Sequence, residues 1–115
     1  MHEAAITHSI LKSVLQTVAD ENVDGYVTHI YVTVGVTQGI VPDSMQMYFE
    51  LEKPGTILEN AELIITMQGI VARCDECGKE HELDIPVMYC PDCASPMELI
   101  KGNEIIISSI EVENE

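Results

Sequence analysis

All four cysteines of the chain fall into two C-x-x-C pairs, and this pattern constrains the fold more than any other feature of the sequence. Twelve residues separate Cys77 from Cys90. Two intervening residues let one tight turn direct both sulfurs inward, and twelve residues suffice for a short hairpin between the turns. Zn²⁺ is commonly held by four thiolates in a tetrahedron. We therefore predict a zinc ribbon with the ligands Cys74, Cys77, Cys90 and Cys93.

The residues around the two cysteine pairs also suit tight turns. Gly78 directly follows the first pair, where a left-handed backbone is often needed. Pro91 lies inside the second pair and stiffens its turn. A redox-active dithiol is the alternative interpretation of the pairs. Since no cysteine lies outside the two pairs, the pattern favours zinc.

Size and composition limit what surrounds the ribbon. A chain of 115 residues has the length of one domain. At this size a fold buries about 65% of the unfolded chain's surface, which allows one modest core. The ribbon is then expected to be a satellite whose folding depends on metal. With no Trp and one Phe, the core must be aliphatic.

The charge of the chain restricts its partners. Twenty acidic residues against five basic ones give a net charge of −15, which repels phosphate backbones. A metal cation or a basic protein surface fits such a chain better. No apolar run approaches the ~18 residues of a membrane span, and the start lacks the basic region of a signal peptide. Metal-binding, reduced cysteines indicate the cytosol as the compartment.

The rest of the chain alternates helical and extended patterns, which predicts an α+β fold. Ile10, Val14 and Val18 belong to an apolar stripe at helical spacing, so a helix is predicted over residues 3–22. Residues 27–34 alternate and are rich in β-branched side chains, as expected of a strand. The remaining predicted elements are a helix at 42–52 and strands at 61–71, 98–101 and 104–113.

The last predicted strand needs a sheet to join, and the earlier strands offer one. The ribbon is therefore expected to be an insertion between strands of the first domain. This predicts a small two-helix, mixed-sheet domain at 1–71 plus 102–115 and an inserted zinc-ribbon domain at 72–101. The C-terminal strand is also a plausible element to exchange between chains, so the expected state is a monomer or a domain-swapped dimer.

The first two residues offer three nitrogen donors. The α-amine of Met1, the backbone nitrogen of His2 and the His2 Nδ1 atom can close two adjacent chelate rings. Three nitrogens in one plane suit Ni²⁺ or Cu²⁺. The alternative is a frayed terminus without function.

The chain combines several features in one order: Met1-His2-Glu3 opening a helix, residues 50–55, the four-cysteine ribbon, Gly102-Asn103-Glu104 and residues 109–113. Together these features resemble the HypA/HybF family of nickel-insertion accessory proteins for nickel–iron hydrogenases. The resemblance covers the whole chain in the same order. A zinc ribbon alone is shared with many families, so its combination with Met-His-Glu at the start makes the match specific.

The resemblance implies a nickel-binding α/β domain and a structural zinc domain. It implies transient Ni²⁺ held by Met1 and His2, with Glu3 adjacent or contributing, and Zn²⁺ held by the four cysteines. The implied function is a nickel metallochaperone that delivers its cargo during hydrogenase maturation. The implied partners are a HypB-like maturation GTPase and the precursor of the hydrogenase large subunit; some members also serve urease.

Other functions are kept as alternatives. A zinc-ribbon protein–protein adaptor or nucleic-acid-binding module is the first, although residues 74–93 hold six acids against the one base Lys79. A thiol oxidoreductase is the second. No catalytic set of a hydrolase and no phosphate loop stands out, so we expect no enzyme.

The three remaining histidines have simple expected roles. His8 lies at the edge of the helical stripe and is expected to be half-buried, and His29 shares a strand face with Tyr31 and Thr33 as a surface residue. His81 is expected in a solvated loop. A sharper hypothesis is that protonation of His81 near neutral pH alters the ribbon and couples the zinc site to nickel loading.

Overall fold

The chain folds as two compact units, each assembled from segments that are distant in the sequence. A computed structural model describes residues 2–114. The first unit contains the residues up to Val32, Ile40–Ile65 and the residues from Ile107 onward. The second unit contains Thr33–Gly39 and Thr66–Ile106.

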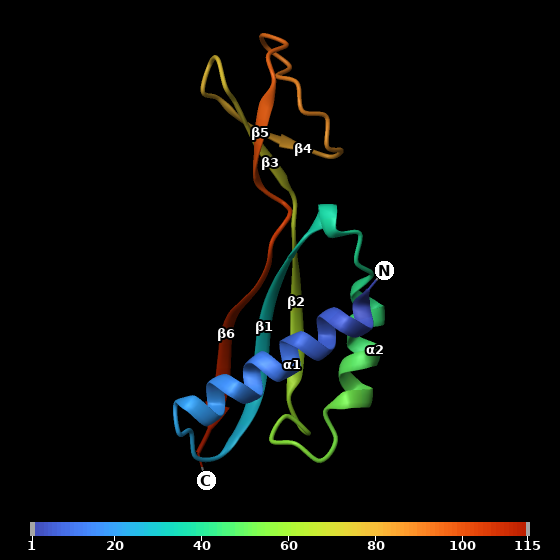
Figure 1. The fold of residues 1–115 in the computed structure, drawn as a ribbon, viewed down its shortest axis with the longest axis vertical. Coiled ribbons are helices and arrows are strands. Elements are labelled where there is room, and N and C mark those ends of the chain that lie inside the picture. The colour runs from blue at the N-terminus through green and yellow to red at the C-terminus, as the bar shows by residue number, and fades with distance from the viewer. Residues whose placement is uncertain (1, 115) are drawn as a thin grey trace. The chain divides into compact units, whose positions relative to one another are not determined.

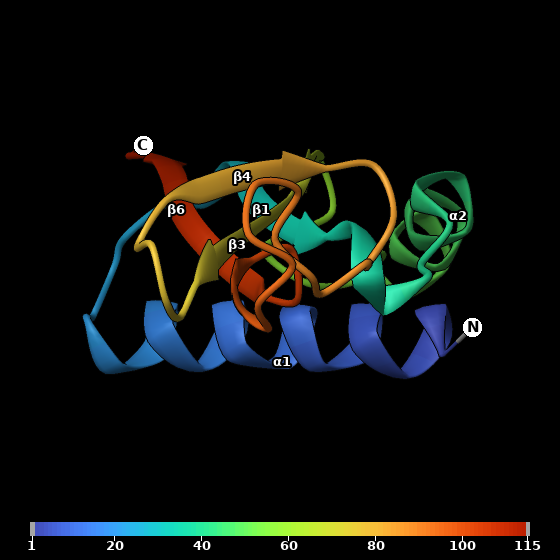
Figure 2. The same ribbon diagram turned by 90° about the horizontal axis from the view of Figure 1, so that it is seen from above.

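Two helices and a three-stranded sheet characterise the first unit (Figure 1). Two views show α1 lying across one face of the sheet (Figures 1 and 2). Helix α2 lies next to β2, and the Gln46 side-chain amide of α2 donates a hydrogen bond to the Leu63 carbonyl of β2 at 2.6 Å. The strand order in this sheet is β2-β1-β6. The elements are α1 (Glu3–Asp20), β1 (Tyr26–Gly35), α2 (Pro42–Glu52), β2 (Glu62–Gln68) and β6 (Ile105–Glu113). A short 3₁₀ helix, η1 (Val36–Gln38), belongs to the second unit.

The core of the first unit is aliphatic apart from one phenylalanine. Helical spacing in α1 buries one stripe of side chains, and alternation in β1 buries every second residue from Ile30 to Val34. Pro42 starts α2 at the position where its missing N–H costs nothing. The largest fully buried side chains of this unit are Phe49, Ile30, Met45, Leu58, Val14, Val27, Val32 and Thr7.

A small antiparallel sheet with the order β4-β3-β5 characterises the second unit. Its strands are β3 (Ile70–Cys74), β4 (Glu80–Leu83) and β5 (Met97–Lys101). Strand β3 is central, pairing Arg73 with Glu80 on one side and Cys74 with Met97 on the other. The sheet therefore brings the two cysteine-bearing turns to the same end of β3.

Two glycines let two segments of the second unit cross at close range. A Cβ atom on Gly35 would lie 2.2 Å from the Gly102 backbone, a distance that no side chain tolerates. The Gly35 N–H donates to the Glu104 carbonyl at 2.7 Å, and Gly102 has a φ of 113°. The Thr37 hydroxyl also donates to the Gly102 carbonyl, at 2.7 Å. The segment after β1 is thus fastened to the turn before β6.

The α+β class with two helices is confirmed, and so is α2 at residues 42–52. The last strand joins β1, as expected of it. The prediction of one strand over residues 61–71 is wrong, because the chain breaks at Gly69 and its two halves join different sheets. The continuous apolar run around Ile64 gave no sign of this division.

Candidate metal sites

The first cysteine turn closes the end of β3. The Cys74 N–H donates to the Lys79 carbonyl at 2.9 Å, and the Gly78 N–H donates back to the Cys74 carbonyl at 3.0 Å. Gly78 adopts the left-handed conformation that this turn requires, with a φ of 73°. The Cys77 N–H also lies 3.4 Å from the Cys74 sulfur, close enough to donate to it. The turn therefore presents both sulfurs on one side.

The second cysteine turn repeats the backbone hydrogen bonds of the first. The Cys90 N–H donates to the Ser95 carbonyl at 2.8 Å, and the Ala94 N–H donates to the Cys90 carbonyl at 2.8 Å. Ala94 occupies the position that Gly78 has in the first turn, and its φ is 61°. A left-handed residue with a Cβ atom costs roughly 1–2 kcal/mol. The sequence does not indicate this left-handed residue, since alanine gives no signal for a left-handed turn.

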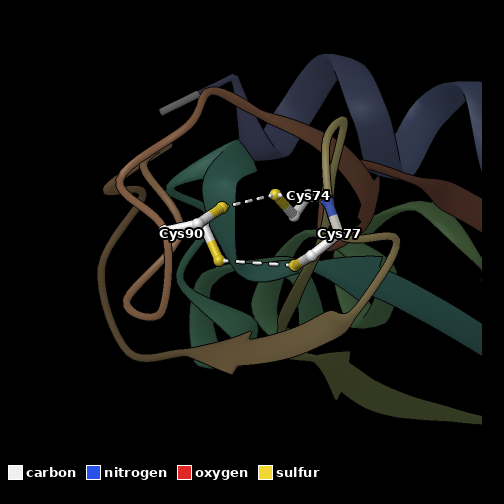
Figure 3. A group of neighbouring side chains, drawn as sticks. Cys74, Cys77 and Cys90 are labelled. Atoms are coloured by element: carbon white, nitrogen blue, oxygen red, sulfur yellow. Dashed lines mark hydrogen bonds between the residues drawn. The ribbon is translucent and has the colours of Figure 1, made fainter.

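The two turns bring the four predicted sulfurs together. All four Sγ atoms lie within 4.8 Å of one another. The Cys74–Cys93 pair is 3.3 Å apart and the Cys77–Cys90 pair 3.8 Å apart. Figure 3 shows the Cys77 and Cys90 sulfurs facing each other. With metal–sulfur bonds of about 2.3 Å, a tetrahedral site needs sulfurs about 3.8 Å apart. The arrangement fits a tetrahedral metal ion.

The turns also set the protonation of the thiols. The pKa of Cys74 is lowered to about 6, first because the Cys77 backbone N–H stabilises its thiolate. At Cys77 the Lys79 N–H is the largest single influence and lowers the pKa. The neighbouring Cys74 and Cys90 sulfurs and burial together outweigh it, and the pKa of Cys77 rises to about 11. Protons must therefore leave when a metal ion binds, because a metal needs thiolates.

His81 lies against the sulfur cluster instead of in a solvated loop, so that expectation is wrong. It belongs to β4, where pairing opposite Ala72 places it beside the second turn. Its Nε2 atom lies 3.5 Å from the Cys90 sulfur and 4.0 Å from a carboxylate oxygen of Asp92. In β4, alternate residues point to opposite faces, and this alternation directs His81 toward the sulfurs. The strand has only four residues, too few for its alternation to be recognised in the sequence. The coupling of the zinc site to nickel loading through His81 stays a prediction.

At the other predicted site, His2 is exposed and has a φ of 67° at the start of α1. Met1, the residue that supplies the amine in the prediction, lies outside the described residues. The carboxylate of Glu3 accepts a hydrogen bond from the Val41 N–H at 3.4 Å. Glu3 therefore links the first turn of α1 to Val41, the residue directly before α2.

The remaining histidines lie apart from the four cysteines. His8 is exposed, not half-buried as expected, because it projects from α1 to the Glu52 carboxylate, 3.3 Å away. His29 stacks beside Tyr31 and lies 3.4 Å from Glu62, on the partly exposed face that the strand alternation predicted.

The fold and the sulfur cluster define a class: a small α+β protein with four clustered cysteines that could hold a metal ion. Over residues 1–112 the chain matches the family model described as HypA, hydrogenase/urease nickel incorporation, metallochaperone. It is 37% identical over 114 residues to the hydrogenase maturation factor HypA of Aquifex aeolicus, covering 98% of both chains. The chain belongs to the HypA family of nickel-incorporation metallochaperones.

Solved structures show the same fold. The solution structure of the nickel metallochaperone HypA from Helicobacter pylori matches with a TM-score of 0.70 at 20% identity, over 100% of both chains. A second HypA solution structure matches with a TM-score of 0.76 at 19% identity, covering 100% of this chain and 98% of that one. Among the described residues, the helices are too short or too polar to cross a membrane. The family resemblance of the sequence is thus confirmed.

Proposed function

We propose that this member of the family carries Ni²⁺ on Met1 and His2, with Glu3 adjacent, and Zn²⁺ on the four cysteines. The observation that carries the proposal is the family match, which starts at residue 1 and so includes the Met-His-Glu start. The division of labour follows the predicted domains, with nickel on residues 1–71 plus 102–115 and zinc on residues 72–101. The chain acts as a carrier and not as an enzyme.

The chemistry of the terminus suits a cargo that must be released. An amine, a backbone nitrogen and an imidazole nitrogen that are adjacent in the chain form a planar nitrogen set, which Ni²⁺ accepts better than Zn²⁺ does. His2 is exposed, so a partner can reach the ion. The hydrogen bond from Val41 to Glu3 supports a fixed position for the residue next to these donors. The net charge of −15 further favours capture of a cation.

The cysteine site suits a resident ion. Four thiolates complete the tetrahedron of Zn²⁺ and leave no position open for another ligand. Such an ion contributes stability to the fold around it. His81, with a nitrogen 3.5 Å from the Cys90 sulfur, is placed to stabilise that thiolate by donating a hydrogen bond.

The recipient in this proposal is a nickel–iron hydrogenase. A hydrogenase is named in the relative from Aquifex aeolicus, whereas the family description names urease as well. The chain would act in the cytoplasm with a HypB-like maturation GTPase and the large-subunit precursor. The acidic surface favours basic partners and disfavours nucleic acid.

Calorimetric Ni²⁺ titration of protein with its native N-terminus tests the nickel site. One residue added before Met1 moves the amine out of the chelate, and His2→Ala removes the imidazole. We expect both changes to abolish tight nickel binding while zinc stays near one ion per chain. His8→Ala is the matched control, because His8 is also an exposed histidine of the first unit.

The outcomes separate the possible sites clearly. If the extended protein binds Ni²⁺ as tightly as the native one, the terminal chelate is wrong. If His8→Ala weakens binding as much as His2→Ala does, the imidazole of the site has been misassigned.

A further inference from the structure

A short loop of the second unit exposes large apolar side chains at three alternate positions. The docking loop, residues 84–89, connects β4 to the second cysteine turn (Figure 1). Ile85, Val87 and Tyr89 are 63%, 48% and 64% exposed. Met88, between them, packs against the buried cluster of the sulfur site. The loop therefore has one inward side chain and an apolar outer surface.

The backbone of the docking loop is held in place. The Val87 N–H donates to the Ile85 carbonyl at 2.8 Å, which closes a tight turn around Pro86. Tyr89 forms a bridge with Pro96, and the Met97 N–H donates to the Met88 carbonyl at 2.9 Å. Because the loop is tied to the segment before β5, a partner would lose little free energy in ordering it.

Acidic side chains accompany the apolar ones. Asp84, the first residue of the docking loop, directly precedes Ile85, and Glu82 lies two residues earlier in β4; both are exposed. Residues 70–101 contain seven acidic and three basic side chains. Two of the three bases already form ion pairs within the unit, Arg73 with Glu80 at 3.2 Å and Lys79 with Asp92 at 3.5 Å. The field around the loop is therefore negative.

We propose that the docking loop binds an apolar segment of a partner protein that also carries lysine or arginine. Apolar side chains on a fixed backbone supply contact area, and the acidic neighbours select a basic partner. A second copy of the chain fits poorly, because a symmetric contact would bring two negative surfaces together. An anionic membrane is repelled for the same reason. The docking surface itself follows from exposure and charge; only naming the partner as one of the nickel-delivery proteins rests on the proposed carrier function.

A peptide of alternating valine and lysine serves as the probe. It is titrated into isotope-labelled, zinc-loaded protein with a native N-terminus, and amide chemical shifts are recorded. We expect shifts at residues 84–89 and a dissociation constant that rises with salt. Replacing both Ile85 and Val87 by serine should weaken binding about tenfold, the order expected from losing part of two aliphatic contacts. Ile106→Ser is the matched control, since Ile106 is comparably exposed in the same unit.

Three further arms make the test decisive. A serine–lysine peptide of equal charge should bind about tenfold more weakly, because it lacks the apolar contacts. Asp84→Asn leaves the apolar side chains in place and should reduce the salt dependence. The zinc content of each variant shows that the site is still formed. Equal binding of both peptides, or equal weakening by Ile106→Ser, would overturn the proposal.

The same samples distinguish a basic partner from other occupants of the docking loop, and they distinguish the docking loop from the nickel site. Binding to phosphatidylcholine vesicles, or self-association that the double variant abolishes, would assign the surface to a membrane or to a second copy and reject the proposal. Nickel titration of the double variant should match that of the unchanged protein. Loss of peptide binding in the double variant with nickel binding intact therefore supports the docking loop independently of the nickel site. Failure of nickel binding with peptide binding intact would reject the terminal nickel site and leave the docking loop in place.

Discussion

The two units of the chain bury very different sets of side chains. The first unit encloses a broad apolar core from two helices and a sheet, with Phe49 and Ile30 fully buried. In the second unit a separate cluster consists of Ala72, Cys74, Cys90 and Met97, with Leu83 and Met88 packed against it. Two of its four buried residues are candidate metal ligands. The first unit therefore has a mainly aliphatic core, whereas candidate metal ligands form half of the buried cluster in the second unit.

The difference indicates what stabilises each unit. Full burial of a large aliphatic side chain contributes about 1.5–3 kcal/mol, and the first unit has many such side chains. The second cluster has too few to offset the conformational entropy of ordering its turns. Small units of this kind depend on a metal ion, so the second unit should fold only with its metal bound.

Removing the metal should therefore have the largest effect, and only on the second unit. With a strong chelator, or in Cys90→Ser, we expect amide signals of residues 70–101 to collapse towards unfolded positions. The helical circular dichroism should persist, because both helices belong to the first unit. Loss of the helical signal together with the metal would show that the two units do not differ in this way.

Truncating a side chain in the core of the first unit should destabilise that unit and leave the metal site of the second unit in place. Phe49→Ala removes a fully buried ring and should lower the free energy of unfolding of the first unit by about 3–5 kcal/mol. Urea unfolding followed by helical circular dichroism measures this change, and zinc content should stay near one ion per chain. Leu51→Ala, on the same helix but exposed, is the control and should change stability by less than about 0.5 kcal/mol.

The smallest expected effect comes from exchanging the left-handed residues of the two cysteine turns, which are an alanine in one turn and a glycine in the other. Ala94→Gly relieves a left-handed alanine and should stabilise the metal-bound second unit by about 1 kcal/mol. Gly78→Ala introduces the same strain and should cost about as much. Competition with a zinc indicator measures both, and 1 kcal/mol corresponds to about fivefold in affinity. Equal affinities in both variants would mean that the turns differ by more than their left-handed residue.

Local patterns in the sequence predicted most elements of the fold. The stripe through Val14 marks α1, and Pro42 marks the start of α2. Both are properties of neighbouring residues, so they can be read without knowing the rest of the fold. The division at Gly69 could not be read this way, because β2 and β3 join different sheets and only their distant partners separate them. The placement of His81 escaped for the same reason, since it depends on the pairing of β4 with β3.

The spacing of the four cysteines by itself determined that two similar turns would bring four sulfurs together in a cluster that could hold a metal ion, because thiolate chemistry and short-range turn geometry leave few alternatives. The start of the chain likewise predicted its nitrogen donors, which are adjacent along the backbone. Tertiary structure decided the rest. It set His81 beside Cys90, fastened Glu3 to the start of α2 and turned Ile85, Val87 and Tyr89 outward. Contacts between segments that are far apart in the chain are fixed only when the whole fold forms.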